Sequence, residues 1–325
     1  MKPPAIYFSS LQFHTESKEL IDQAFQLIAF PTPADTDQAS RETAEVLFAP
    51  LGWFWGLSEF EQMPRLKVIA SNTTGHPHID VVAAKERGIS VVTLKGQKSF
   101  LDSITPTAEH TIGLIIAITR NYRTATASVK EGRWSRFPHA GEKMLSRSEV
   151  GIVGLGRLGK QVARFCVALG MTVYAYDPYL SEEIPDVALL PSLEELVANV
   201  DIVTVHVPHD PKTERMFEKQ LFDRFRWGSF FVNTARGELV ATDDLLSALE
   251  QGRLAGAALD VLEDEFNPEF NLKNSPAWIY AQSKMNLILT PHIGGSTKDA
   301  WRDTQMFVIK RAIELCNRSE FANDF

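Results

Sequence analysis

The sequence predicts an α/β protein with two doubly wound parallel-sheet domains, one of which is inserted into the other. Short apolar runs alternate with helical patterns in two blocks that meet near residue 105, which favours parallel sheets with helical crossovers. A glycine-rich turn lies in mid-chain, at residues 154–159. Only one further helix-length segment follows residue 295, and we expect it to return to the first block. The predicted domains are therefore residues 1–105 with 296–325, and the inserted residues 106–295.

In the first block, short apolar runs predict strands and the segments between them predict helices. The expected strands are 5–8, 46–48, 67–70 and 90–92, and the expected helices are 17–27, 59–63 and 79–86. Next comes a long helical segment, 107–130, whose stretch TIGLIIAITRNY is apolar nearly all round. Such a helix is expected to be buried between domains, and it is too short to cross a bilayer.

The second block repeats the alternation on a larger scale. Its expected strands are 149–153, 172–176, 201–205, 229–232, 254–258 and 286–289. Helices are expected after residues 157 and 192, over 218–224 and 242–251, and finally over 297–317. The segment 263–283 is rich in proline, asparagine and aromatic residues, and it predicts a loop with about one helical turn.

Composition narrows the class of protein and of partner. The 325 residues are 44% hydrophobic and 23% charged, which is typical of a globular protein, and the net charge is −8. Nucleic acids and anionic membranes need clustered basic residues, so neither is the expected partner. The two cysteines, Cys166 and Cys316, have no disulfide or metal-ligand spacing. No metal is expected, and without a signal-peptide core or membrane span we expect a cytoplasmic location.

The mid-chain turn has the pattern of a dinucleotide site. Gly154, Gly156 and Gly159 form G-x-G-x-x-G between a predicted strand and a predicted helix. These glycines permit a tight turn, a close approach to a pyrophosphate and close packing of helix on strand. Asp177 ends the next strand, where a carboxylate accepts both ribose hydroxyls and repels a 2′-phosphate. We therefore predict a Rossmann domain that binds NAD in preference to NADP, with Arg157 and Leu158 also meeting the pyrophosphate.

Three further polar segments follow predicted strands, at the sheet edge where open α/β folds bind ligands. They are VNTARGELV at 232–240, ALDVLEDE at 258–265 and LTPHIGGST at 289–297. Arginine suits a substrate carboxylate, because its planar guanidinium binds both oxygens. Histidine suits proton transfer near neutral pH, and a carboxylate can hold it. Arg236, Glu265 and His292 supply these three groups, and together they predict chemistry on a 2-keto or 2-hydroxy acid.

In this order, the glycine motif, VTVHVPHDPKT, NTARG, ALDVLEDE and TPHIGGST resemble the D-isomer-specific 2-hydroxyacid dehydrogenases. That family includes phosphoglycerate, D-lactate, glyoxylate/hydroxypyruvate and formate dehydrogenases, and the resemblance runs from about residue 67 to about residue 303. It implies a Rossmann cofactor domain inserted into a flavodoxin-like substrate domain. It also implies an oxidoreductase that transfers hydride between NAD(H) and C2 of a small D-2-hydroxy acid.

The resemblance assigns roles residue by residue. Arg236 matches the carboxylate-binding arginine, His292 the proton donor and acceptor, and Glu265 its partner. The implied cofactor contacts are Gly154, Gly156, Arg157, Leu158, Gly159, Asp177, Val207, Pro208, Thr213, Thr234, Ala235, Arg236, Asp260, His292, Ile293, Gly294 and Gly295. SNTTGHPHID resembles the substrate loop, which places Asn72, Thr74 and Gly75 in the pocket beside Arg236. The family usually has proline after the glutamate, whereas Phe266 stands here in a longer loop, so Glu263 and Asp264 stay open as alternatives.

Other features leave alternatives open. The aromatic run LGWFWG at 51–56 either lines a pocket or packs on the surface. Lys95 and Lys98 either meet a second anionic group of the substrate or are solvated, and His206 is expected to support the site from the end of a strand. The segment 107–134 resembles the family's dimer-forming helix and loop, which implies a homodimer. The rival functions are an NAD-sensing regulator of the corepressor type and a formate or phosphite dehydrogenase.

Overall fold

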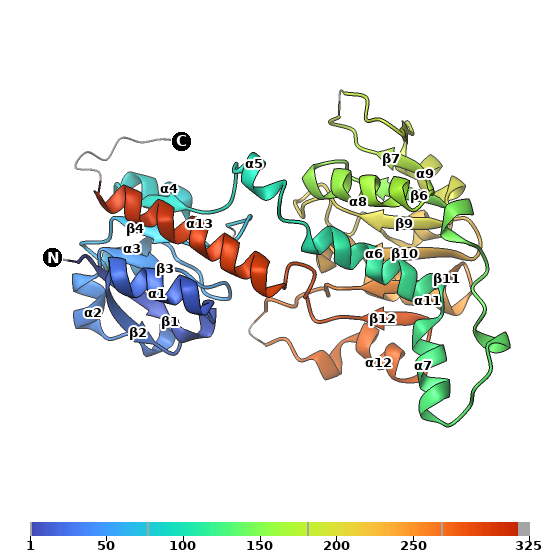
Figure 1. The fold of residues 1–325 in the computed structure, drawn as a ribbon, viewed down its shortest axis with the longest axis horizontal. Coiled ribbons are helices and arrows are strands. Elements are labelled where there is room, and N and C mark those ends of the chain that lie inside the picture. Colours follow the sequence, from blue (N-terminus) through green and yellow to red (C-terminus); the bar gives the residue numbers. More distant parts are fainter. Residues whose placement is uncertain (1, 77, 181, 268, 318–325) are drawn as a thin grey trace. The chain divides into compact units, whose positions relative to one another are not determined.

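The computed structural model describes residues 2–76, 78–180, 182–267 and 269–317 (Figure 1). The chain divides into two compact units. Unit 1 comprises Met1–Ile104 with Thr297–Phe325, and unit 2 comprises Thr105–Ser296. Each unit is built on its own parallel sheet, which confirms the predicted α/β fold class.

Unit 1 contains a five-stranded parallel sheet in the order β2-β1-β3-β4-β5 in the described part of the chain. The strands are β1 (Pro4–Phe8), β2 (Gln26–Phe30), β3 (Val46–Phe48), β4 (Val68–Ala70) and β5 (Ser90–Val92). This is the order of the flavodoxin-like doubly wound folds, in which helices cover both faces of the sheet. Residues on successive positions of β1 point to opposite faces, so Ala5 and Ile6 belong to different cores.

The two faces of the unit 1 sheet carry different helices. The helices of this unit are α1 (Thr15–Ala24), α2 (Gln38–Thr43), α3 (Leu57–Glu61), α4 (Val81–Glu86), α5 (Lys98–Leu101) and α13 (Lys298–Asn317). On one face, Ile21 and Phe25 from α1 and its end pack with Val308 and Ile309 of α13. On the other face, Phe60 of α3 joins the core formed with α4. The last helix therefore completes unit 1, although it follows unit 2 in the sequence.

Unit 2 contains a seven-stranded parallel sheet in the order β12-β11-β10-β9-β6-β7-β8 among the described residues. The strands are β6 (Glu149–Val153), β7 (Thr172–Tyr176), β8 (Val187–Leu189), β9 (Ile202–Val205), β10 (Ser229–Asn233), β11 (Leu254–Leu259) and β12 (Leu287–Leu289). The chain order reverses between β6 and β9, which are hydrogen-bonded neighbours. Such a switch point opens a crevice at the carboxyl ends of the strands, where dinucleotides bind in Rossmann folds.

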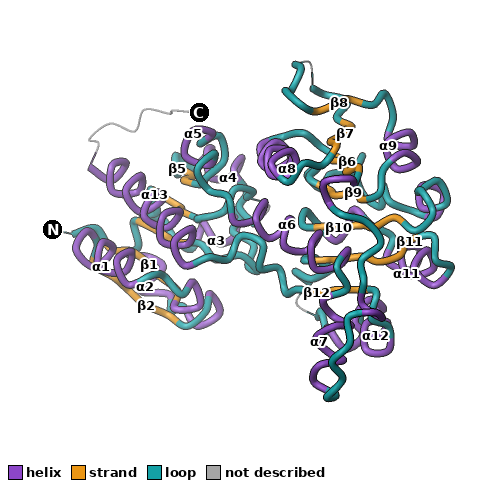
Figure 2. The backbone as a smooth tube through the Cα atoms, turned by 45° about the vertical axis from the view of Figure 1, so that its right-hand side comes forward, coloured by secondary structure: helices purple, strands orange, loops and turns teal. Residues whose placement is uncertain are grey.

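Helices cover both faces of this sheet as well (Figure 2). They are α6 (Pro106–Thr119), α7 (Tyr122–Lys130), α8 (Arg157–Ala168), α9 (Leu193–Asn199), α10 (Lys219–Phe222), α11 (Thr242–Glu250) and α12 (Pro276–Ser283). Helices α6 and α8 pack on one face, where the Cys166 thiol is buried and burial raises its pKa to about 12. Helices α9 to α12 pack on the other face around a cluster of four phenylalanines.

The structure corrects several expected element boundaries. The helix predicted over 17–27 ends at Ala24, and its last residues belong to β2, an edge strand whose half-exposed residues give little alternation. The helix predicted over 107–130 is two helices, because Asn121 adopts a left-handed backbone with φ of 54°. The expected loop 263–283 contains α12, which is longer than a single turn. No described helix is long and apolar enough to span a membrane.

Candidate active site

Three loops lie side by side at the carboxyl edge of the unit 2 sheet. They follow β10, β11 and β12, which are consecutive neighbours in the sheet. The three sequence segments that predicted the site occupy these loops, so parallel strand order brings them to one edge. Backbone hydrogen bonds join them, from Asp260 N to Asn233 O and from Thr290 N to Leu259 O.

A buried carboxylate, Asp260, holds the loop after β12. It is 2% exposed, and its oxygens accept hydrogen bonds from Thr290 Oγ1 at 2.6 Å and from the amides of Ile293 at 2.9 Å and Gly294 at 2.7 Å. His110 Nε2, on α6, lies 3.3 Å from Asp260 Oδ1. Burial alone would raise the pKa of Asp260, but these donors outweigh it and hold that pKa below its usual range.

The loop held by Asp260 carries His292. Its backbone is left-handed, with φ of 52°, and its amide donates to the Asp260 carbonyl at 2.8 Å. A left-handed backbone at a residue other than glycine is strained, and such strain often marks functional sites. The His292 side chain is about one-third exposed, so the imidazole can reach a ligand.

Glu265 is the carboxylate that contacts His292. Its Oε1 lies 2.6 Å from His292 Nδ1, and the Glu265 side chain is mostly buried. The alternatives are occupied or exposed: Glu263 accepts from the Thr242 hydroxyl, and Asp264 is exposed. Phe266, the residue that departs from the family pattern, places its ring 5.6 Å from the imidazole. A carboxylate on Nδ1 fixes the hydrogen there and leaves Nε2 for a substrate atom.

Arg236 lies in the loop after β10, and the side chain of Asn233 holds the backbone of that loop. Asn233 donates from Nδ2 to the Arg236 carbonyl at 2.7 Å and accepts from the Ala235 amide at 2.9 Å. The Arg236 side chain is exposed, and its Nη1 donates to the Ala235 carbonyl. A Cβ at Gly237 would stand 2.0 Å from the carbonyl carbon of Leu262, so only glycine lets this loop pack on the loop of Glu265.

The glycine-rich loop after β6 has the geometry that its sequence predicts. Gly154 has φ of +88°, and a Cβ at Gly159 would stand 2.0 Å from the Gly154 carbonyl oxygen. A Cβ at Gly156, which caps α8, would meet no described protein atom within 4 Å. The open space at the N-terminus of α8 suits a phosphate that approaches the backbone closely. Asp177 lies beside this loop, and its Oδ2 accepts from the Leu155 amide at 2.8 Å.

The remaining cofactor candidates follow β9 and β10. Val207 and Pro208 lie in the loop after β9, and the Thr213 hydroxyl donates to the Pro208 carbonyl at 2.8 Å. The buried Thr234 hydroxyl lies 2.9 Å from that of Thr111 on α6. His206 is partly buried, its imidazole lies 3.0 Å from the Thr204 hydroxyl, and burial lowers its pKa to about 3, so it is uncharged at neutral pH. These contacts stabilise the loops that follow β9 and β10.

The predicted substrate loop lies in unit 1 and is described within that unit. Asn72, Thr74 and Gly75 follow β4, and the Thr73 hydroxyl donates to the Gly75 carbonyl at 2.6 Å. The Leu94 amide donates to the Thr73 carbonyl, which ties this loop to the one after β5. Thr74 and Gly75 are exposed, so their amides are accessible to a ligand. Within unit 2, by contrast, the structure brings Glu265 and His292 into direct contact.

The residues of unit 1 for which the sequence left two interpretations lie partly in the core and partly on the surface. In the run at 51–56, Trp55 is buried against Phe8, whereas Phe54 is 58% exposed. Lys95 Nζ lies 3.2 Å from His76 Nε2, at the same edge of the sheet as the predicted substrate loop. Lys98 is exposed at the start of α5. The aromatic run is therefore partly core and partly surface.

Sequence reasoning missed the side chains that support the loops. His110 and Thr290 contact Asp260, and Asn233 shapes the Arg236 turn, but none was a candidate. The available signal was the pair His110 and Thr111, polar residues that directly precede the apolar run of this helix. No group of acidic, histidine or cysteine side chains in the described residues has the arrangement of a metal site.

Comparison with known proteins gives a consistent picture. A family model described as "D-isomer specific 2-hydroxyacid dehydrogenase, NAD binding domain" matches residues 112–294. The D-3-phosphoglycerate dehydrogenase of Methanocaldococcus jannaschii is 35% identical over 287 residues, which are 86% of this chain and 51% of the relative. A D-specific alpha-keto acid dehydrogenase of Enterococcus faecium is 36% identical over 260 residues, covering 78% and 77%. The chain spans about half the length of the phosphoglycerate dehydrogenase relatives that it matches.

Solved structures show the same fold over nearly the whole chain. A D-2-hydroxyisocaproate dehydrogenase superposes with a TM-score of 0.84 at 24% identity, covering 98% of both chains. A D-lactate dehydrogenase from Aquifex aeolicus, complexed with NAD and lactic acid, gives a TM-score of 0.78 at 26% identity. That match covers 95% of this chain and 94% of the other.

The close approach at Gly237 predicts the effect of a single methyl group. Gly237→Ala places a Cβ against the backbone of Leu262, so the loops must separate, and we expect a loss of about 1–3 kcal/mol or more. Gly156→Ala is the control, because its Cβ meets no protein atom and only the N-cap weakens, by at most about 1 kcal/mol. Calorimetric unfolding of both variants measures the difference, and equal melting temperatures would contradict the predicted clash.

Proposed function

Since this chain belongs to the D-isomer specific 2-hydroxyacid dehydrogenase family, we propose that it transfers a hydride between NAD and C2 of a small D-2-hydroxy or 2-keto acid. The observation that carries the proposal is the His292–Glu265 pair at 2.6 Å, which joins the loops after β12 and β11, the second of which lies next to the loop of Arg236. This pair supplies proton transfer, and Arg236 supplies a carboxylate clamp. A 2-keto acid needs both groups at once.

The two units take different parts in this proposal. We propose that unit 2 is the cofactor domain, predicted from the sequence over residues 106–295. Unit 1 is the proposed substrate domain, predicted over residues 1–105 with 296–325. The residues of unit 2 fit NAD because the N-terminus of α8 is open at Gly156 and a carboxylate, Asp177, directly follows β7. Asp177 would accept the ribose hydroxyls and repel a 2′-phosphate, which favours NAD over NADP.

The proposed cofactor contacts surround the carboxyl edge of the unit 2 sheet. They are Gly154, Gly156, Arg157, Leu158, Gly159, Asp177, Val207, Pro208, Thr213, Thr234, Ala235, Arg236, Asp260, His292, Gly294 and Gly295. When bound, the nicotinamide ring supplies or accepts the hydride. The side chains of the protein bind the substrate and transfer the proton.

The proposed mechanism assigns one task to each side chain. Arg236 binds the substrate carboxylate, and the loop of Asn72, Thr74 and Gly75 in unit 1 is the proposed substrate loop. Glu265 keeps the hydrogen of His292 on Nδ1 and stabilises the imidazolium. His292 Nε2 then donates a proton to the substrate oxygen during reduction and accepts it during oxidation. The same pair therefore serves both directions.

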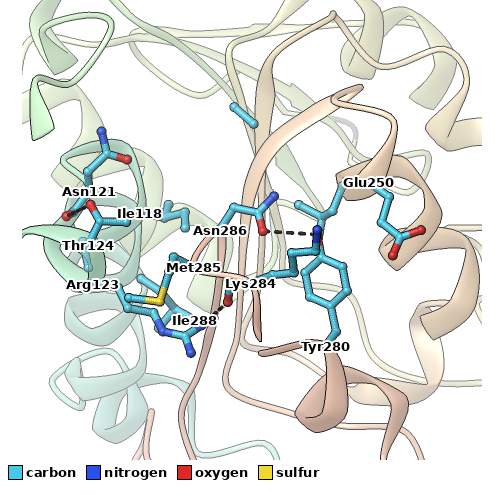
Figure 3. Close-up of a pocket in the computed structure, with 13 residues that line it drawn as sticks. Ile118, Asn121, Arg123, Thr124, Glu250, Tyr280, Lys284, Met285, Asn286 and Ile288 are labelled. Carbon is cyan, nitrogen blue, oxygen red and sulfur yellow. Dashed lines mark hydrogen bonds between the residues drawn. The ribbon is translucent and has the colours of Figure 1, made fainter. Parts of the chain in front are cut away.

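We also propose a homodimer formed through α7 and the segment that follows it. Large apolar side chains are exposed there: Tyr122, Val129, Trp134, Phe137 and Met144. A cavity of about 340 Å³ lies beside α7, at the amino ends of β11 and β12 and therefore opposite the catalytic loops (Figure 3). Arg123 stands in its wall and donates to the carbonyls of Ala281 and Lys284 at the end of α12 and of Leu287 in β12. We propose that a second copy of the exposed segment packs against this cavity.

The central experiment is an NADH-oxidation screen. Glyoxylate, pyruvate and bulkier 2-keto acids test the plain substrates, and hydroxypyruvate phosphate and 2-oxoglutarate test a second anionic group. We expect turnover with at least one of them and a loss of about 10²-fold or more in His292→Ala, the usual contribution of a general acid. NADH binding, followed by fluorescence, should persist in the variant.

The screen also separates the rival functions. NADH binding without turnover of any keto acid would favour an NAD-sensing regulator. Oxidation of formate or phosphite in the absence of keto-acid reduction would favour a formate or phosphite dehydrogenase. Activity of His292→Ala near the wild-type level would contradict the proton-transfer role.

Asp177 makes a second prediction, about cofactor choice. Asp177→Asn keeps an acceptor for the Leu155 amide but removes the negative charge, so the preference for NADH over NADPH should fall by about tenfold, equivalent to 1.4 kcal/mol. Kinetics with both cofactors measure the ratio. Glu183→Gln, an exposed acid in the following segment, is the control and should leave the ratio unchanged. An unchanged ratio in Asp177→Asn would remove its ribose role.

The proposed dimer predicts a change of mass in solution. Trp134→Ser with Phe137→Ser removes the two most exposed aromatic side chains of the segment, so the dimer should dissociate at micromolar concentration. Light scattering measures the mass. Tyr179→Ser, 81% exposed elsewhere in unit 2, should leave the dimer intact. A monomeric wild-type protein would contradict the assembly.

A further inference from the structure

We propose that His110 on α6 is a positioning residue for His292, acting through Asp260 and Thr290 to fix the loop that carries the proton donor. The inference rests on the proposed function, because it takes His292 as the group that exchanges a proton with the substrate. His110 itself is placed in no contact with substrate. Its part is to hold a buried hydrogen-bonded network in one arrangement.

The hydrogen-bond directions assign His110 as a donor. Thr290 Oγ1 lies 2.6 Å from Asp260 Oδ1 and must use its own hydrogen there, since an ionised carboxylate only accepts. His110 Nε2 lies 3.1 Å from the same Thr290 oxygen and 3.3 Å from Asp260 Oδ1. Both neighbours of Nε2 therefore accept, so Nε2 carries the hydrogen. His110 completes the set of donors around the carboxylate.

That carboxylate controls the conformation of His292. The oxygens of Asp260 bind the amides of Ile293 and Gly294, and its carbonyl binds the amide of His292. These bonds hold His292 at φ of 52°, a conformation that a residue with a side chain adopts only when its surroundings impose it. Weakening the donors on Asp260 therefore loosens the strained turn before it loosens the rest of the sheet.

The setting of His110 argues against a packing role alone. Helix α6 buries Leu114, Ile115 and Ile118 in the core of unit 2, and an apolar residue at position 110 would serve packing equally well. Thr111, the next residue, makes the equivalent contact to Thr234 on the loop of Arg236. Two consecutive polar residues of one helix thus each support one of the proposed catalytic loops.

The charged surroundings define the expected pH dependence. Among the donors to Asp260 in the described part of the chain, His110 is the one that titrates, because Thr290 and the two amides do not titrate, and the His292 side chain pairs with Glu265. The pKa of Asp260 is held below its usual range, so the clamp is present at neutral pH and is lost as pH falls through that lowered pKa. Removal of the His110 donor raises the pKa of Asp260, so the clamp is lost at a higher pH.

The test compares three variants. His110→Leu fills the space without a donor, and His110→Gln returns an amide donor near the position of Nε2. Thr111→Val is the matched control, because it removes the side-chain hydrogen bonds of a residue on the same helix, to Thr234 and to the Thr107 carbonyl, without touching Asp260. In His110→Leu we expect kcat to fall about tenfold, as for loss of a hydrogen bond to a charged group, with the acid limb of the kcat/KM profile moved to higher pH. His110→Gln should recover most of kcat.

Thr111→Val should instead raise the KM for the keto acid, through Thr234 and the Arg236 loop, and leave the acid limb in place. A second readout does not need activity: the melting temperature of His110→Leu should begin to fall at a higher pH than that of the wild type.

The outcomes separate this inference from the proposed function. If His110→Leu keeps the wild-type kcat and acid limb, then His110 has no specific positioning role. The same conclusion follows if Thr111→Val also lowers kcat and also moves the acid limb to higher pH. If the wild-type protein reduces no 2-keto acid, then the proposed function fails. The pH dependence of the melting temperature would still show whether His110 supports Asp260, and an unchanged dependence overturns the inference.

Discussion

The site depends on the burial of one charge, the carboxylate of Asp260. A carboxylate taken out of water is stable only when donors replace the lost hydration. Here those donors come from helix α6, from the end of β12 and from the amides that follow His292. Satisfying the charge therefore also fixes the loop that carries the imidazole. The strained backbone of His292 persists because relaxing it would leave part of a buried carboxylate without partners.

The strand order of the sheet places the proposed catalytic loops at one edge, and glycines allow the close contacts between backbone segments there. Parallel order places the loops after β10, β11 and β12 at one edge, but side chains with Cβ atoms would hold the loops apart. Gly237 lets the Arg236 loop touch the backbone of Leu262, and Gly159 lets α8 touch the Gly154 carbonyl. Both contacts join backbone to backbone, so neither can adjust by a change of side-chain rotamer. Proximity of the two proposed catalytic loops is thus built into the main chain.

The sequence predicted what local pattern and ordered motifs encode. Strands with buried faces, such as β6 and β9, and the segments that carry Arg236 and His292 lie where their patterns placed them. Edge strand β2 was missed because its half-exposed residues show no clear alternation, and the break between α6 and α7 depends on one left-handed asparagine. The support from His110 to Thr290 joins residues far apart in the chain, and no local pattern indicates such a contact. The requirement at Gly237 likewise exists only because Leu262 is adjacent in space.

The departure of this chain from the family pattern after Glu265 has a physical explanation in the same clamp. Asp260 begins the loop that presents Glu265, and its side chain and carbonyl also hold the turn that presents His292. The distance between the imidazole and the carboxylate is therefore set by two short segments anchored at one residue. The segment between Glu265 and His292 contains α12, and the length of that segment does not affect the distance between the two side chains. Each doubling of a loop costs only about 0.6 kcal/mol in closure entropy, so a longer excursion is tolerated. Phe266 can accordingly replace proline and pack beside the imidazole, while the pair stays at 2.6 Å.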